Sequence, residues 1–106
     1  MIHPKKICVF CASSPGIDKI YFRDAEILAK VFLKNHIHIV YGGGSSGLMG
    51  HIADTMLSGG GKITGVIPGF MKKMNWSHPE VSDMIEVETM HERKNRMILG
   101  VDAVVA

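Results

Sequence analysis

Apolar residues fall along the chain in two alternating patterns, which predict short strands separated by helices. Five brief apolar runs are typical of strands covered on both faces, at 6–10, 38–41, 63–67, 84–87 and 102–105. Longer stretches repeat apolar residues every three or four positions and predict helices, at about 18–35, from Met49 through Met56 to a stop at Gly59, and at about 90–99. This order predicts βαβ units, and therefore an α/β, Rossmann-like open parallel sheet with helices on both faces.

The segment between the third and fourth predicted strands has no clear pattern. Pro68-Gly69 is expected to end the third strand, and residues 70–79 are predicted to be mostly loop. The fifth predicted strand runs to the end of the sequence, at Ala106. We therefore expect a single domain over residues 1–106, whose sheet stops after about the fifth strand, where another ligand-facing loop would begin.

Composition and charge narrow the class of protein. Of 106 residues, 46% are hydrophobic and 21% charged, which is ordinary for a globular domain. The net charge of +2 is too small to favour nucleic acid or an anionic membrane as the main partner. No apolar run approaches the roughly 18 residues of a membrane span, and the N-terminus lacks the apolar stretch of a secretory signal. We expect a cytoplasmic protein that binds neither nucleic acid nor a membrane.

Cys8 and Cys11 form a C-x-x-C spacing, which admits a redox or metal-binding interpretation and a purely structural one. Redox pairs of this kind lie at helix N-termini, whereas Cys8 lies within a predicted strand. Three residues along a strand span about 10 Å and put the two side chains on opposite faces, which does not suit a disulfide. We interpret both cysteines as small core residues.

The histidines and methionines suggest no cofactor site. The six histidines lack the spacing of metal ligands, and His36 and His38, which flank the start of a strand, are expected to be exposed. His51 is placed in a helix and His78 in a loop. The eight methionines are interpreted as core residues. We therefore expect no metal and no cofactor.

The strongest local signal is the glycine-rich segment 41–50, which follows a strand and opens a helix. Glycine lets the backbone turn sharply and approach a ligand closely, and the free N–H groups of a helix N-terminus suit a phosphate. Gly42, Gly44 and Gly47 also fit the G-x-G-x-x-G pattern of dinucleotide-binding proteins. However, that pattern requires an acidic residue at the end of the next strand, where this chain has Ile67-Pro68. A purely structural interpretation, close packing of helix on strand, also remains open.

A second signal is the charged segment 89–94. Thr89 and Glu92 have the spacing of a capping box, which predicts that a helix begins here. Arg93 and Lys94 then fall in or near the first turn, where cations oppose the helix dipole by a few tenths of a kcal/mol, up to about 1 kcal/mol each. A bound anion would reverse the sign of that effect. The alternative is an ordinary solvated charge run.

The polar loop after the first strand adds a third, weaker signal. Ser13 and Ser14 follow that strand and therefore lie at the carboxyl edge of the predicted sheet. Their hydroxyl and backbone N–H groups could hold a phosphate or a ribose. Polar loops are common, so this segment acquires meaning only together with the other two.

Taken together, the motifs resemble a known family. Segments 8–16, 41–50, 65–68 and 90–94 occur in the order and spacing of the Lonely Guy family, also called lysine decarboxylase-like proteins, over nearly the whole chain. The resemblance implies a Rossmann-like fold, a homodimer, and hydrolysis of a nucleoside 5′-monophosphate to free base and ribose 5-phosphate. The substrate is an N6-modified adenosine monophosphate in the cytokinin branch and AMP in other members. It implies no metal or redox cofactor, and the sequence shows no pyridoxal-phosphate lysine site that would suit a decarboxylase.

The resemblance also implies roles for individual residues. Arg93 matches the family's catalytic arginine, and Lys94 a substrate-binding position. The substrate-binding residues of the two loops are expected to be Gly43, Gly44 and Ser45, together with Ser13 and Ser14.

Two departures from the family pattern bear on activity. The family continues after Ala106 with a Pro-Gly-Gly-x-Gly-Thr-x-Glu segment that supplies a phosphate-binding loop and a catalytic glutamate, and this sequence does not contain it. A substrate-contacting glutamate expected near Asn75 is here an amide. Glycosidic hydrolysis needs a carboxylate to assist water or the leaving base, and Glu92 cannot easily serve if it caps a helix. The alternatives are therefore a non-catalytic module that binds a nucleotide or the molybdenum cofactor, or an inactive fragment of the enzyme.

Overall fold

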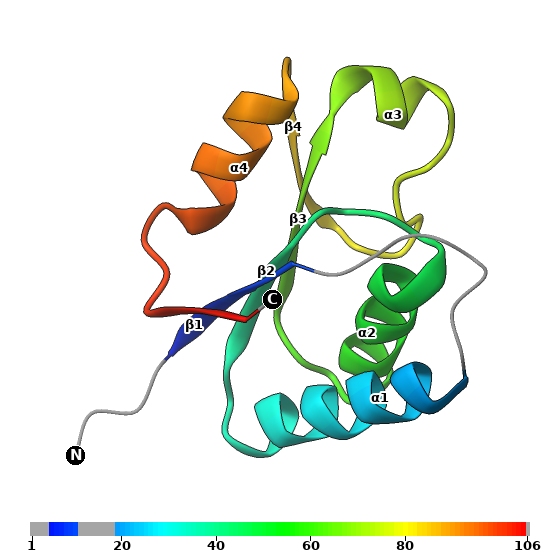
Figure 1. Ribbon diagram of the computed structural model, residues 1–106, viewed down its shortest axis with the longest axis vertical. Coiled ribbons are helices and arrows are strands. Elements are labelled where there is room, and N and C mark those ends of the chain that lie inside the picture. Colours follow the sequence, from blue (N-terminus) through cyan, green and yellow to red (C-terminus); the bar gives the residue numbers. More distant parts are fainter. Residues whose placement is uncertain (1–4, 11–18, 106) are drawn as a thin grey trace.

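The chain folds into one parallel sheet with helices on both faces (Figure 1). A computed structural model describes residues 5–10 and 19–105; Cys11, Ser13 and Ser14 lie outside the described residues. Along the chain the elements are β1 (Lys6–Val9), α1 (Lys19–Lys34), β2 (His38–Tyr41), α2 (Gly47–Ser58), β3 (Ile63–Pro68), α3 (Gly69–Lys73), β4 (Asp83–Val87), α4 (Met90–Ile98) and β5 (Ala103–Val105). The strand order is β4-β3-β2-β1-β5, with every pairing parallel. The Rossmann-like fold predicted from the sequence is confirmed.

The alternation of side chains along each strand builds two separate cores. Ile39 and Tyr41 of β2 face α1 and α2, which lie together on one side of the sheet (Figure 1). Val40 faces the opposite side, where it packs with Cys8 and with Met97 of α4. Because successive strand residues point to opposite faces, continuous apolar runs are required when helices cover both sides. Cys8 is a fully buried free thiol in the α4-side core, which agrees with its structural interpretation.

The start of α4 follows from local chemistry. The Thr89 hydroxyl accepts a hydrogen bond from the Glu92 N–H at 3.1 Å, so the predicted cap of α4 is present. The return half of the capping box differs: the Glu92 carboxylate accepts from the N–H of Glu88, one residue before the cap, at 3.4 Å. The carboxylate is therefore engaged at the helix start, although not with the N-cap N–H that a capping box uses.

The unpatterned segment contains a helix that the sequence did not predict. β3 continues through Pro68, and α3 begins immediately after it at Gly69, where residues 70–79 were expected to be mostly loop. Five residues are too few to display a helical repeat, so periodicity could not reveal α3. Asn75 follows the helix with φ of 61°, a left-handed conformation that asparagine tolerates better than most residues.

Two expectations about exposure were wrong in part. His38 is half-buried, and its Nε2 lies 2.7 Å from the hydroxyl of Thr64 on the neighbouring strand. The Thr64 hydroxyl in turn donates to the carboxylate of Asp83 at 2.5 Å. His36 is exposed, as expected. Met56 and Met97 are core residues, but Met74 and Met90 are about half exposed, at 55% and 50%.

No helix of the described residues is long and apolar enough to cross a bilayer.

Candidate functional site

The segments singled out in the sequence meet at the carboxyl edge of the sheet. The glycine-rich turn, Gly42–Gly47, follows β2 and leads into α2, while α4 begins just after β4. α3 follows β3 at the same edge (Figure 1). Because all strands are parallel, the three connections lie on one rim of the molecule.

Glycine is required in the turn by conformation and by space. Gly43 has φ of 79°, and a Cβ built there would lie 2.9 Å from the sulfur of Met84 and 3.1 Å from Ile67. Gly50, in the first turns of α2, packs directly on the carbonyl of Ser45 and leaves no room for a side chain. Close packing of turn, strand and helix therefore accounts for part of the motif, as the structural interpretation held.

Each carbonyl of the three consecutive glycines accepts a hydrogen bond from a different part of the chain. Gly42 accepts from the Arg93 guanidinium, Gly43 from the N–H of His78 at 2.9 Å, and Gly44 from the hydroxyl of Tyr41 at 3.1 Å. Hydrogen bonds to these three carbonyl oxygens therefore hold the backbone of the turn in place.

Two of its amide donors are also engaged within the protein. The Gly44 N–H faces the sulfur of Met49 at 3.3 Å, and the Ser45 N–H donates to Trp76 at 3.1 Å. We expected the amides of this turn to face an anion, and these two do not offer a free donor. The first turn of α2 can still offer donors to an anion, because the first N–H groups of a helix have no partner within the helix.

Arg93 extends from the first turn of α4 across the end of the sheet. Its Nε donates to the carbonyl of Val66 at 3.0 Å and its Nη2 to that of Gly42. Its Nη1 faces two thioether sulfurs, those of Met71 at 3.9 Å and Met90 at 4.0 Å. Thioethers are weak acceptors, so this edge of the guanidinium keeps most of its hydrogen-bonding capacity.

The electrostatic setting of Arg93 is unusual for a cation. The side chain is half-buried, and burial lowers the pKa of its guanidinium, an effect that Tyr41 partly opposes. Within residues 5–10 and 19–105, no carboxylate forms an ion pair with it. A desolvated cation without a counter-ion favours the binding of an anion.

A cavity of about 400 Å³ opens beside Arg93. Its volume falls in the range of small-molecule sites. Most of its wall is apolar, and Arg93 and Lys94 supply the cationic part; the other lining residues are Val9, Phe10, Gly42, Met49, Met90 and Met97. The sequence suggested a phosphate site at this edge, whereas most of the cavity wall is apolar and two of its lining residues are cations. Such a chamber suits a ligand with a flat apolar part and a charged end.

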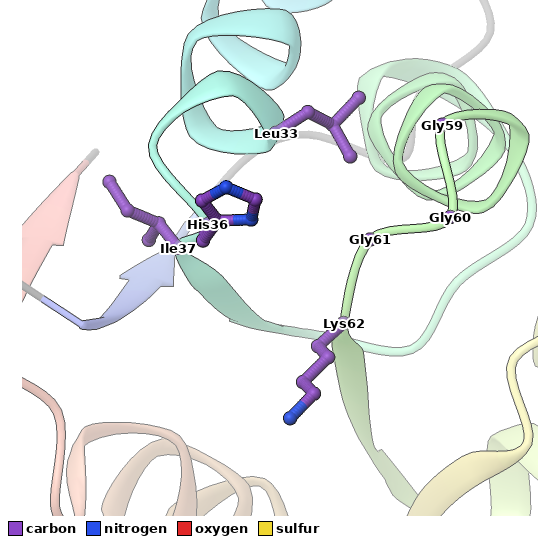
Figure 2. A pocket seen from close by; sticks show the side chains of 7 residues that line it. All are labelled: Leu33, His36, Ile37, Gly59, Gly60, Gly61 and Lys62. Carbon is purple, nitrogen blue, oxygen red and sulfur yellow. The ribbon is translucent and has the colours of Figure 1, made fainter.

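A second cavity, of about 390 Å³, lies at the opposite edge of the sheet, where β2 and β3 begin (Figure 2). Leu33 points from the end of α1 toward Gly59 at the end of α2, while the Lys62 side chain extends away from both helices (Figure 2). Both helices present their C-terminal, negative ends here, which disfavours a phosphate. This edge is therefore a poorer candidate for a nucleotide.

A third cavity, of about 550 Å³, lies beside the Asp54–His78 pair and is lined by Ser45, Asp54 and residues of segment 75–80. None of the described residues forms a group of three or more His, Cys, Asp or Glu side chains that could hold a metal.

The structure thus brings together Arg93, Lys94 and the start of the glycine-rich turn, and it adds contacts that the sequence did not predict. Met71 and Met90 flank the guanidinium, and His78 holds Gly43. Nothing in the sequence distinguished these methionines from core residues. His78 lies in the segment that had no pattern.

Comparison with known proteins identifies a matching family and related enzymes. A family model described as "Possible lysine decarboxylase" matches residues 49–106. A probable cytokinin riboside 5′-monophosphate phosphoribohydrolase of Oryza sativa subsp. japonica is 43% identical over 103 residues, which is 96% of this chain and 45% of that protein. A cytokinin riboside 5′-monophosphate phosphoribohydrolase of Arabidopsis thaliana is 41% identical over 103 residues, covering 96% and 48%. The chain therefore spans about half the length of these relatives.

A solved structure supports the fold. The X-ray structure of TM1055, a structural genomics target, superimposes with a TM-score of 0.74 at 19% identity, over 94% of this chain and 58% of that one. The family model covers more than half of the chain, and the curated relatives carry the name that the motifs predicted. The chain therefore belongs to the family described as "Possible lysine decarboxylase", and its resemblance to the Lonely Guy phosphoribohydrolases is confirmed.

Proposed function

We propose that this chain is the nucleotide-binding part of a phosphoribohydrolase, which hydrolyses the N-glycosidic bond of a nucleoside 5′-monophosphate. The products would be the free base and ribose 5-phosphate. The names of the curated relatives support this reaction, although the chain spans about half their length.

The observation that carries the proposal is the environment of Arg93. Its half-buried guanidinium has two donors fixed on backbone carbonyls, and among the described residues its third edge faces the thioether sulfurs of two methionines. No described carboxylate neutralises it. An incoming phosphate or ribose oxygen would therefore replace weak contacts with charge-assisted hydrogen bonds. Lys94, the next residue, lines the same cavity and adds a second positive charge.

The apolar wall of the cavity provides a place for the base. Phe10 and Met49 contribute a ring and a flexible thioether, both of which pack well on a flat heterocycle. A base in this chamber and a phosphate toward the cationic side would place the ribose between them. Arg93 would then hold the sugar-phosphate end and stabilise charge as the bond to the base breaks.

The chemical step needs a carboxylate in addition. Cleavage passes through an oxocarbenium-like sugar, and a carboxylate must activate the water or protonate the leaving group. Glu92 is held at the start of α4 by the Glu88 N–H. The family resemblance assigns this role to the glutamate of the Pro-Gly-Gly-x-Gly-Thr-x-Glu segment. For the 106 residues alone, we therefore propose nucleotide binding without turnover.

Calorimetry combined with an assay for free base tests both parts. The chain is titrated with AMP and with its N6-isopentenyl analogue, and the same mixtures are analysed for released base. We expect binding of at least one nucleotide and no release. Absence of binding would contradict the nucleotide site, and release would contradict the need for a further carboxylate.

A longer version that includes the family's Pro-Gly-Gly-x-Gly-Thr-x-Glu segment tests the enzymatic proposal. We expect it to release free base and ribose 5-phosphate from AMP or its N6-modified form. If it binds nucleotide but releases no base, the chain belongs to a non-catalytic binding module. The homodimer and the cytoplasmic location remain predictions, which sedimentation and cell fractionation can test.

A further inference from the structure

A short segment after α3 lies antiparallel against the glycine-rich turn. We call this segment, Trp76–His78, the strap. The Ser45 N–H donates to the carbonyl of Trp76 at 3.1 Å, and the N–H of His78 donates to Gly43 at 2.9 Å. Between these two bonds, Ser77 and Gly44 form an antiparallel bridge. Three consecutive strap residues thus hold three consecutive turn residues.

The strap is directed toward the turn by the end of α3. Asn75 is left-handed, with φ of 61°, and reverses the chain as it leaves the helix. The N–H of Trp76 donates back to Met71 at 3.1 Å and closes the reversal. The carbonyl of Trp76 then accepts the Ser45 hydroxyl, at 3.3 Å, in addition to the Ser45 amide.

His78 connects the strap to α2 through its side chain, which is 5% exposed. Its Nδ1 accepts a hydrogen bond from the Glu80 N–H at 3.1 Å, so the proton of the neutral ring is on Nε2. That Nε2 lies 2.6 Å from a carboxylate oxygen of Asp54 on α2, to which it donates. Both ring nitrogens therefore have a partner, and the ring orientation is fixed.

These contacts form a circuit, by which we mean a continuous loop of covalent and hydrogen-bonded connections that begins and ends at the glycine-rich turn. The glycine-rich turn opens α2, α2 carries Asp54, Asp54 holds His78, and the strap that contains His78 returns to the turn. A turn rich in glycine has many accessible conformations, and a binding loop that is not fixed in its bound form loses affinity. The circuit restricts the turn before any ligand arrives.

We propose that His78, held by Asp54, is a positioning residue that keeps the glycine-rich turn in its nucleotide-binding conformation. This inference rests on the proposed function for the ligand, but the ordering of the turn can be measured without one. His78 does not line the cavity beside Arg93. It acts through the backbone of Gly43 and, with the strap, through Ser45.

Substitutions at both ends of the Asp54–His78 contact test the proposal. Asp54→Ala removes the hydrogen-bond partner of His78. The Asp54 side chain itself is 65% exposed, so the fold should persist. His78→Ala removes the ring, whereas His78→Gln retains an N–H donor that can reach Asp54. Asp24→Ala, on the exposed face of α1, and His51→Gln, whose ring on α2 contacts Glu26 and Phe22 of α1, serve as matched controls.

Two readouts are measured: amide hydrogen exchange at Ser45 in the absence of ligand, and AMP affinity by calorimetry. If the turn adopts its binding conformation only about a tenth of the time without the Asp54–His78 contact, the affinity for AMP falls about tenfold. We expect Asp54→Ala and His78→Ala to accelerate exchange at Ser45 and weaken AMP binding about tenfold, and His78→Gln to restore most of both. The two controls should change neither.

The outcomes separate this proposal from the proposed function. Unchanged Ser45 exchange in Asp54→Ala and His78→Ala would overturn the positioning role. Faster exchange with unaltered AMP affinity would overturn it as well, because the turn would then not need to be held. A wild-type chain that binds no AMP would contradict the nucleotide site instead, whatever the exchange rates are.

Discussion

The Nη2 of Arg93 donates a hydrogen bond to the carbonyl oxygen of Gly42, a residue 51 positions earlier in the chain. This contact joins the first turn of α4 to the start of the glycine-rich turn. It places the guanidinium against β3 and the end of β2, in the wall of the apolar cavity.

Replacement of Arg93 by lysine should destabilise the chain, because a single ammonium nitrogen cannot reproduce the two separate donors, Nε and Nη2, that hold two backbone carbonyls. Loss of one or both hydrogen bonds from a partly buried cation should lower the free energy of unfolding by about 1–2 kcal/mol. Arg96→Lys, on the exposed side of the same helix, is the matched control and should change it by less than about 0.5 kcal/mol. Urea denaturation measures both. Equal effects would show that the contacts of Arg93 do not stabilise the fold.

Gly43→Ala should cost more than Gly60→Ala. Both residues are left-handed, with φ of 79° and 72°, so each alanine incurs a backbone cost of about 1–2 kcal/mol. A Cβ at Gly60 meets no atom within 4 Å, whereas one at Gly43 crowds Met84 and Ile67. This crowding should add about 1–3 kcal/mol. If urea denaturation shows the same loss of stability in both variants, the close packing of the turn on β3 is not a constraint.

Asn75 should tolerate glycine but not glutamate. The residue has φ of 61°, where asparagine and glycine are favoured over other side chains. Asn75→Gly is expected to leave stability within a few tenths of a kcal/mol, and Asn75→Glu to lower it by about 1 kcal/mol. Thermal unfolding followed by circular dichroism provides the comparison. A glutamate variant as stable as wild type would mean that the reversal after α3 does not depend on this conformation.

The stability of the chain should fall as the pH drops through the range in which a free histidine titrates. Burial lowers the pKa of His38, and the nearby charge of Lys6 adds to this effect, although Asp83 opposes it. The unfolded chain, with an ordinary histidine pKa of about 6.5, therefore binds more protons than the folded one below that pH. Protons thus favour unfolding, and stability is lost on acidification below about pH 6.5.

His38→Gln should reduce this dependence on pH, because glutamine can still donate to Thr64 but does not titrate. Denaturant unfolding of both proteins between pH 7.5 and pH 5 gives the comparison, with pH values chosen around the ordinary histidine pKa of about 6.5. His36→Gln, at an exposed position, controls for the loss of one histidine. Parallel curves for wild type and His38→Gln would contradict the assignment to His38.

The sequence predicted the elements that contain enough residues to display a period. The strand at Ile63–Pro68 and the helix at Met90–Ile98 were placed within about one residue, because apolar runs and a capping threonine mark them directly. It also brought the glycine-rich turn and Arg93 to one edge of the sheet, because parallel strands leave their carboxyl ends together.

What the sequence did not predict depends on contacts between distant residues. The helix α3 is only five residues long, and the strap after it is held by hydrogen bonds to the turn rather than by a local pattern. The direction of the Arg93 guanidinium, toward the carbonyl of Gly42, is likewise a tertiary property. The amides expected to face an anion at Gly44 and Ser45 are used internally, which only the fold reveals.

The central claim is that a nucleoside monophosphate binds between Arg93 and the glycine-rich turn, and a titration of the ¹⁵N-labelled chain with AMP tests it most directly. We predict saturable shifts that include the Arg93 Nε–H, the amides of Gly42 and Met49, and Lys94, all at the cavity beside Arg93. The amides of Gly59–Lys62, at the opposite edge of the sheet, should stay unchanged (Figure 2). Shifts confined to that opposite edge, or no saturation at Arg93, would contradict the account.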